Sequence, residues 1–77
     1  MLKLTITGAK SYVGVWRANQ PLLDQVLYRG RSVTFWGWQL HVVLGDGAAV
    51  QVQTGATSRP AGAPGQLVRL DMGELAG

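Results

Sequence analysis

The chain has 77 residues and no cysteine, so it forms at most one domain and has neither a disulfide nor a thiolate metal site. Its composition, 47% hydrophobic and 14% charged, excludes a disordered tail. The net charge of +3 rests on few, scattered basic residues, and no apolar run approaches the ~20 residues that span a bilayer. Residues 1–8 alternate like a strand and lack the apolar core of a signal peptide, so any anchor or export signal is expected outside this sequence.

Two strands are predicted at the start of the chain. Residues 2–6 alternate apolar and polar side chains, which is typical of a half-buried strand. Residues 12–17 alternate again, and we expect Val13 and Val15 to face the core because β-branched side chains pack well on a pleated surface. Gly14 lies between two aromatic residues on the other face and is expected to leave a shallow gap there.

Residues 22–28 suit either a short helix or a strand. A helix this short is not stable on propensity alone, and Val26 and Tyr28 favour a strand. We therefore predict a strand with a bulge near Asp24 and Gln25.

The stretch 33–52 is the one around which the chain is organised. Its apolar residues alternate in three runs, over 33–35, 40–44 and 50–52, which predicts three antiparallel strands that bury one face. The Asp46–Gly47 dipeptide tolerates positive φ at both positions, so we expect a tight hairpin between the second and third of these strands.

The amino-acid composition changes in the C-terminal part of the chain. Residues 54–66 hold three glycines and two prolines, which predicts a long connection between sheets with no regular element. Residues 67–72 alternate as a last strand, and residues 73–77 are expected to be a flexible end. About seven short strands, with frequent turns and no confident helix, predict an all-β fold: a small antiparallel two-sheet sandwich, formed by residues 2–72 as a single domain.

The order of these features resembles a known family. Residues 12–15 read aromatic-Val-x-Val, residues 27–32 read Leu-x-x-Gly-x-Ser before a strand, and residues 40–52 read strand, Gly-Asn-like turn and strand. A Pro/Gly loop and a last strand over 67–72 follow. Together they resemble the C-terminal extracytoplasmic domain of RodZ-type bacterial cell-shape proteins, across roughly residues 2–72.

The resemblance implies a β-sandwich on the outer side of the cell membrane. In that family the domain follows a single transmembrane helix and a linker, with a cytoplasmic helix-turn-helix domain before them, and it scaffolds the elongation and cell-wall machinery. The resemblance implies neither enzyme activity nor a cofactor. This chain departs from the family at Tyr12, where Trp is usual, and at Asp46, where Asn is usual.

Four aromatic residues are the candidate partner-binding site. The period-two pattern places Trp16 and Trp36 on the faces opposite the core, with Trp38 on the same parity as Trp36 and Tyr12 on that of Trp16. Outward indoles expose an apolar patch, which usually marks a contact site. The alternative is that one or two of these rings close the open ends of the sandwich.

The sequence predicts no catalytic, cofactor or metal site. His41 is the sole histidine and has no cysteine or nearby carboxylate in sequence, so we expect an ordinary strand residue. The acidic residues lie in different predicted elements, and the serines lack the strand-to-helix elbow of a nucleophile. No helix follows Gly45–Asp46–Gly47, which therefore does not read as a phosphate loop.

Three functions remain open at this point. The first is a non-catalytic interaction module of a membrane-anchored cell-shape protein, which holds an elongation-machinery protein, or a cell-wall glycan, through its aromatic residues. The second is a small basic β-barrel that binds single-stranded nucleic acid by base stacking. The third is a structural spacer without a ligand. The aromatic residues and the resemblance favour the first.

Overall fold

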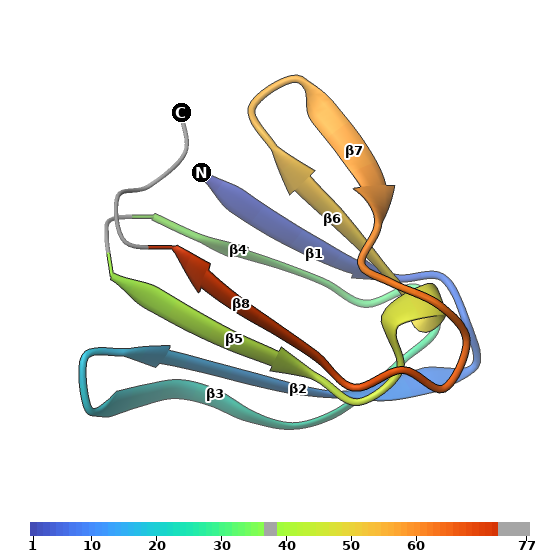
Figure 1. The fold of residues 1–77 in the computed structure, drawn as a ribbon, viewed down its shortest axis with the longest axis horizontal. Helices are drawn as coiled ribbons and strands as arrows, with labels where there is room; N and C mark the ends of the chain where they lie inside the picture. Colours follow the sequence, from blue (N-terminus) through green and yellow to red (C-terminus); the bar gives the residue numbers. More distant parts are fainter. Residues whose placement is uncertain (37–38, 73–77) are drawn as a thin grey trace.

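The computed structural model describes residues 1–36 and 39–72, with the backbone alone at Met72. Eight strands and one short 3-10 turn make up these residues (Figure 1): β1 (Leu2–Ile6), β2 (Lys10–Arg17), β3 (Gln20–Tyr28), β4 (Ser32–Phe35), β5 (Leu40–Leu44), η1 (Gly47–Ala49), β6 (Val50–Thr54), β7 (Thr57–Pro60) and β8 (Val68–Met72). Among them, no helix is long and apolar enough to cross a membrane. The predicted flexible end, residues 73–77, lies outside the described part of the chain.

The strands form two antiparallel sheets, as the sequence predicts, and each sheet has four strands, one more in total than the seven or so expected. One sheet has the order β4-β1-β6-β7 and the other the order β3-β2-β5-β8. Figure 1 shows β3 at the lower margin and β7 at the upper margin of the molecule. Every strand pair in both sheets is antiparallel.

The core lies between the sheets and consists of aliphatic side chains. In β1 the burial alternates along the strand, as the sequence predicts, and Leu2, Leu4 and Ile6 are all 1% exposed or less. Val13 and Val15, both 0% exposed, face them from β2. The rest of the buried cluster is Leu27, Leu40, Val42, Leu44, Val50, Val52 and Val68.

The stretch 33–52 forms the predicted strands, but their pairing differs from the prediction. β5 pairs with β2 and β8 in one sheet, whereas β4 and β6 both flank β1 in the other. The predicted hairpin at Asp46–Gly47 is therefore wrong. Residues 45–49 instead carry the chain from one sheet to the other through η1, and the Gly47 N–H donates to the Gln66 carbonyl at 2.9 Å. This bond ties the crossing to the loop before β8.

Two further predictions need correction. β3 is a strand, but the register shift in its pairing with β2 falls at Leu22, between Pro21 and Leu23, rather than near Asp24 and Gln25. The segment 54–66 also contains a regular element, because β7 forms a hairpin with β6 across Gly55, whose φ is +59°. Glycine adopts this left-handed conformation without a steric penalty, which explains the tight turn. Within segment 54–66, the chain crosses to the other sheet only after β7.

Candidate functional site

One outer surface combines aromatic and charged side chains. The even-numbered residues of β2 point away from the core, and the strand register places their neighbours from β3, β5 and β8 on the same side. We call this surface the aromatic face. Its members are Lys10, Tyr12, Trp16, Asp24, Val26, Tyr28, His41, Val43, Arg69 and Asp71.

The Trp16 ring lies over Gly14, which has no side chain to exclude it. A Cβ atom added at Gly14 would lie 2.4 Å from Cη2 and 2.5 Å from Cζ3 of Trp16, and 2.6 Å from the Tyr12 hydroxyl. The indole ring therefore covers the gap that the sequence predicts at this glycine and reaches back toward Tyr12. Trp16 is half-buried for this reason. The ring thus packs over Gly14 rather than projecting freely from the strand.

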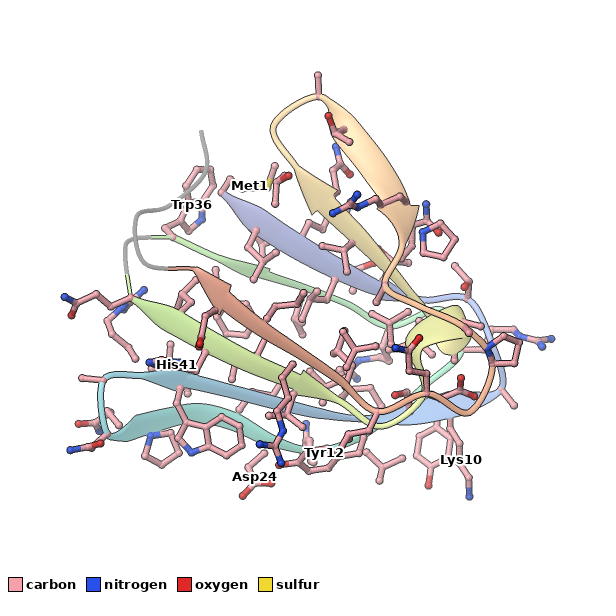
Figure 2. All side chains as sticks on the ribbon, in the orientation of Figure 1. Met1, Lys10, Tyr12, Asp24, Trp36 and His41 are labelled. Carbon is pink, nitrogen blue, oxygen red and sulfur yellow. The ribbon has the colours of Figure 1, made fainter. Side chains whose placement is uncertain are left out.

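The Tyr12 side chain is fixed by Asp24 of the neighbouring strand. Its hydroxyl donates a hydrogen bond of 2.6 Å to Asp24 Oδ1 (Figure 2). This hydrogen bond, with burial and the charge of the carboxylate as smaller causes, raises the pKa of Tyr12 above its ordinary value of 10.0. The hydroxyl proton of Tyr12 is thus retained to higher pH in the folded protein than in the unfolded chain.

The raised pKa predicts how stability changes at alkaline pH. Near pH 10 the unfolded chain loses the tyrosine proton while the folded chain keeps it, so the free energy of unfolding falls from about pH 10 upward until the raised pKa is passed. We expect Tyr12→Phe to lack this contribution and Asp24→Asn to reduce it. Urea unfolding at a series of pH values from 8 to about 11.5 measures the slope. Equal slopes in the native protein and Tyr12→Phe would contradict the assignment.

A second cross-strand pair lies on the same face. His41 is directly opposite Trp16 of β2 on one side and Asp71 of β8 on the other. The His41 Nδ1 atom contacts Asp71 Oδ1, and both side chains are more than half exposed, at 54% and 81%. A carboxylate beside His41 was not predicted from the sequence. Asp71 is 30 residues further along the chain, and only the β5–β8 register brings the two together.

Trp36 does not join Tyr12 and Trp16. It follows β4 in the other sheet, is 69% exposed, and lies near Met1, away from Tyr12 and Asp24 (Figure 2). Its carbonyl accepts a hydrogen bond from the Arg17 guanidinium, which links the two sheets at this end. The outward orientation predicted for Trp36 is confirmed. Trp38, the remaining member of the predicted aromatic set, lies outside the described residues.

Two exposed apolar residues on β3 border the aromatic face and were not predicted from the sequence as part of it. Val26 is 43% exposed and Tyr28 is 60% exposed, next to Tyr12 and Lys10 respectively in the register. Both alternate along β3, but the ambiguity of that segment hid which side they take. Exposed charges of both signs share this face: Lys10 and Asp24 lie on β2 and β3, and Arg69 and Asp71 lie on β8 at the opposite edge of the sheet.

The described residues form a surface rather than a cavity. They contain no pocket and no group of three His, Cys, Asp or Glu side chains that would hold a metal ion. A partner would therefore dock on the sheet from outside. No family model, curated protein or solved structure matches the chain.

Proposed function

We propose that this domain is a non-catalytic interaction module on the outer side of a membrane-anchored bacterial cell-shape protein, and that it holds a protein of the elongation or cell-wall-synthesis machinery. The observation that carries the proposal is the position of the Trp16 ring over Gly14 on the outer face of the sheet. A large ring that packs against its own strand has less conformational freedom to lose when a partner covers it, and Trp and Tyr are among the residues that dominate binding energy in protein interfaces.

The surroundings of Trp16 support a protein partner. The aromatic face has half-buried aromatic rings, exposed apolar side chains from β3 and a mixed set of charges. Aromatic residues are likewise enriched in protein interfaces, where they stand beside polar and charged residues. A glycan would use the ring but leave Val26 and Tyr28 exposed to water, since both lie toward the β3 edge of the face.

The charge of this face does not favour nucleic acid. Its two basic residues, Lys10 and Arg69, are balanced by Asp24 and Asp71. Binding of a phosphate backbone depends on an excess of positive charge along the groove that carries the stacking rings. Of the remaining basic residues, Arg17 is the last residue of β2 and contacts the Trp36 carbonyl of the other sheet. The others lie in other strands or loops: Lys3, Arg29, Arg31 and Arg59.

The test is a titration of the isotope-labelled domain with the extracytoplasmic parts of elongation proteins, followed by NMR. We expect the largest shifts at Tyr12, Trp16 and His41, and we expect Trp16→Ala to weaken binding by roughly tenfold or more, as truncation of a central interface residue does. Trp36→Ala is the matched control. It keeps the carbonyl that Arg17 contacts, and it should bind like the native domain.

Separate arms of the titration distinguish the alternatives. Shifts on the aromatic face with cell-wall glycan fragments, and none with any protein, would replace the protein partner by a glycan. Binding of a single-stranded oligonucleotide that weakens steeply with salt would favour the nucleic-acid function. An aromatic face that stays unperturbed with all three ligand classes would overturn the proposal in favour of a structural spacer.

A further inference from the structure

β3 is the longest strand of the described residues and has a neighbour on one side only. It spans nine residues and pairs with β2 alone, and Figure 1 shows it as the outermost strand at the lower margin. The other edge strands, β4, β7 and β8, have four, four and five residues. A long unpaired edge is a template for pairing with another strand unless the chain protects it.

One hydrogen bond shows which residues of β3 direct their backbone N–H and C=O groups to the open side of the strand. The Arg29 N–H donates to the Ala9 carbonyl at 3.1 Å, on the β2 side. Because the direction of backbone groups alternates along a strand, the odd-numbered residues of β3 bond to β2. Asp24, Val26 and Tyr28 then direct their N–H and C=O groups away from the sheet. The Tyr28 carbonyl also accepts the Arg31 N–H at 3.1 Å, so Tyr28 offers chiefly its N–H.

The edge is protected at one end only. Pro21 has no N–H, and the bulge at Leu22 interrupts the regular pairing there. The Asp24 carboxylate, which would otherwise repel another strand, is held over the sheet by the Tyr12 hydroxyl. From Gln25 to Tyr28 there is no charge, proline or bulge, and Val26 and Tyr28 are exposed.

We propose that β3 pairs with β3 of a second copy of this chain, antiparallel and with the two-fold axis at Val26. In this register Val26 lies opposite Val26 of the second copy, and the two exchange both backbone bonds. The Tyr28 N–H donates to the Asp24 carbonyl of the second copy, and the Tyr28 hydroxyl faces the Asp24 side chain there. Each edge residue thus meets a group that complements it, which is the condition for a symmetric interface.

Neighbouring registers are less favourable for reasons visible in the strand. An axis at Asp24 places two carboxylates opposite each other, and like charges in that position destabilise a strand pair. An axis at Gln25 sets Tyr28 against the bulge at Leu22. An axis at Leu27 sets Asp24 against Gly30, whose N–H already donates to the Ile6 carbonyl at 3.0 Å.

The pairing has a consequence for the aromatic face. A two-fold axis perpendicular to the sheet keeps outer residues on the outer side of both copies, so the two β3-β2-β5-β8 sheets become one continuous sheet. Val26 and Tyr28, the exposed apolar residues at the border of the aromatic face, come to lie at the centre of the joined surface, each beside side chains of the second copy. The two Trp16 rings then lie on the same side of one surface.

The test uses charge at the symmetry axis. Sedimentation equilibrium of the native chain is expected to show a concentration-dependent dimer. In a dimer of Val26→Lys, or of Val26→Glu, two like charges lie opposite each other at the symmetry axis. We expect each variant alone to have a dimer dissociation constant raised by roughly tenfold or more. An equimolar mixture of the two variants is expected to restore association as a heterodimer. Val26→Thr, which keeps the β-branched shape without a charge, should associate like the native chain.

Each outcome decides the proposal. Circular dichroism establishes that every variant is folded before its mass is measured. A native chain that stays monomeric up to about millimolar concentration, beyond which a pair is too weak to matter, would overturn the proposal. So would a Val26→Lys chain that associates as the native one does. A mixture of the Lys and Glu variants that remains monomeric would exclude the symmetric pairing even if each variant alone is monomeric.

Discussion

Leu4→Ala is expected to lower the free energy of unfolding by about 2–5 kcal/mol, the usual range for truncation of a buried leucine. Leu4 is 0% exposed and lies at the middle of β1, which is paired on both sides, with Val33 of β4 and Val52 of β6. The surrounding strands cannot collapse onto the vacated space without breaking their own pairing. A domain of this length has a total stability of only roughly 4–12 kcal/mol, so this single change removes a large part of it.

The matched control is the adjacent residue of the same strand. Lys3 points to the outer face of the β4-β1-β6-β7 sheet, opposite Thr34 and Gln53, and Lys3→Ala should change stability by no more than about 0.5 kcal/mol. The midpoint of urea unfolding measures both variants on the same scale. Similar losses for Leu4→Ala and Lys3→Ala would contradict the placement of the core between the two sheets.

The period-two pattern predicted which side chains are buried. It works for β1, β2 and β5 because each has one face on the core and one on water, so that every second residue must be apolar. The same rule placed Tyr12 and Trp16 together on an outer face, which the structure confirms. Which side chains of a strand are buried depends on the geometry of that strand alone, so alternation within its own residues is enough to predict it.

Strand neighbours could not be predicted in the same way. A Gly-Asp-Gly sequence between two alternating runs is compatible with a hairpin and with a crossing between sheets. The conformation of this turn depends on partners far away in the sequence. The Asp46 N–H donates to Ser11 Oγ at 3.1 Å, and Asp46 Oδ1 accepts the Gly65 N–H at 2.9 Å. These partners are 35 and 19 residues away. Only the folded chain brings them to the turn.

Only part of the candidate site was predicted, because strand neighbours could not be predicted from the sequence. Tyr12 and Trp16 belong to one strand, so their common face followed from parity alone. Assigning Trp36 to a face required knowing that β4 lies beside β1, in the sheet that does not contain β2. Asp24 and Asp71 entered the site through the register of β2 with β3 and of β5 with β8. Polar partners across strands are set by that register, which no single strand reveals.

β7 shows the limit of composition as a guide. Glycine and proline in 54–66 predicted an irregular segment, yet Thr57–Pro60 pairs with β6 in full register. The strand is at an edge and ends in its proline, the position at which a strand loses least by lacking an N–H donor. All four of its residues are exposed, so the sequence has no alternation of apolar and polar residues there that would predict a strand.

Gly47→Ala is expected to destabilise the protein by about 1–3 kcal/mol, as overpacking of a tight contact does. A Cβ atom at Gly47 would lie 2.8 Å from the Gly62 Cα atom, 2.9 Å from the Gly62 nitrogen and 2.8 Å from Val68 Cγ2. Two of these atoms belong to backbone, which cannot turn aside as a side chain can. The Gly62 N–H also donates to the Gly47 carbonyl at 3.1 Å, so moving the two segments apart weakens the connection that joins the sheets.

The control distinguishes this contact from a general effect on turn glycines. Gly55 has a φ of +59° with no atom within 4 Å of an added Cβ, and asparagine tolerates that conformation, so Gly55→Asn should change stability by less than about 1 kcal/mol. Urea unfolding compares the two variants, and amide NMR shifts in Gly47→Ala should concentrate at Gly62 and Val68. In a hairpin at Asp46–Gly47 the methyl group would point to solvent, so shifts confined to residues 44–50 would contradict the crossing.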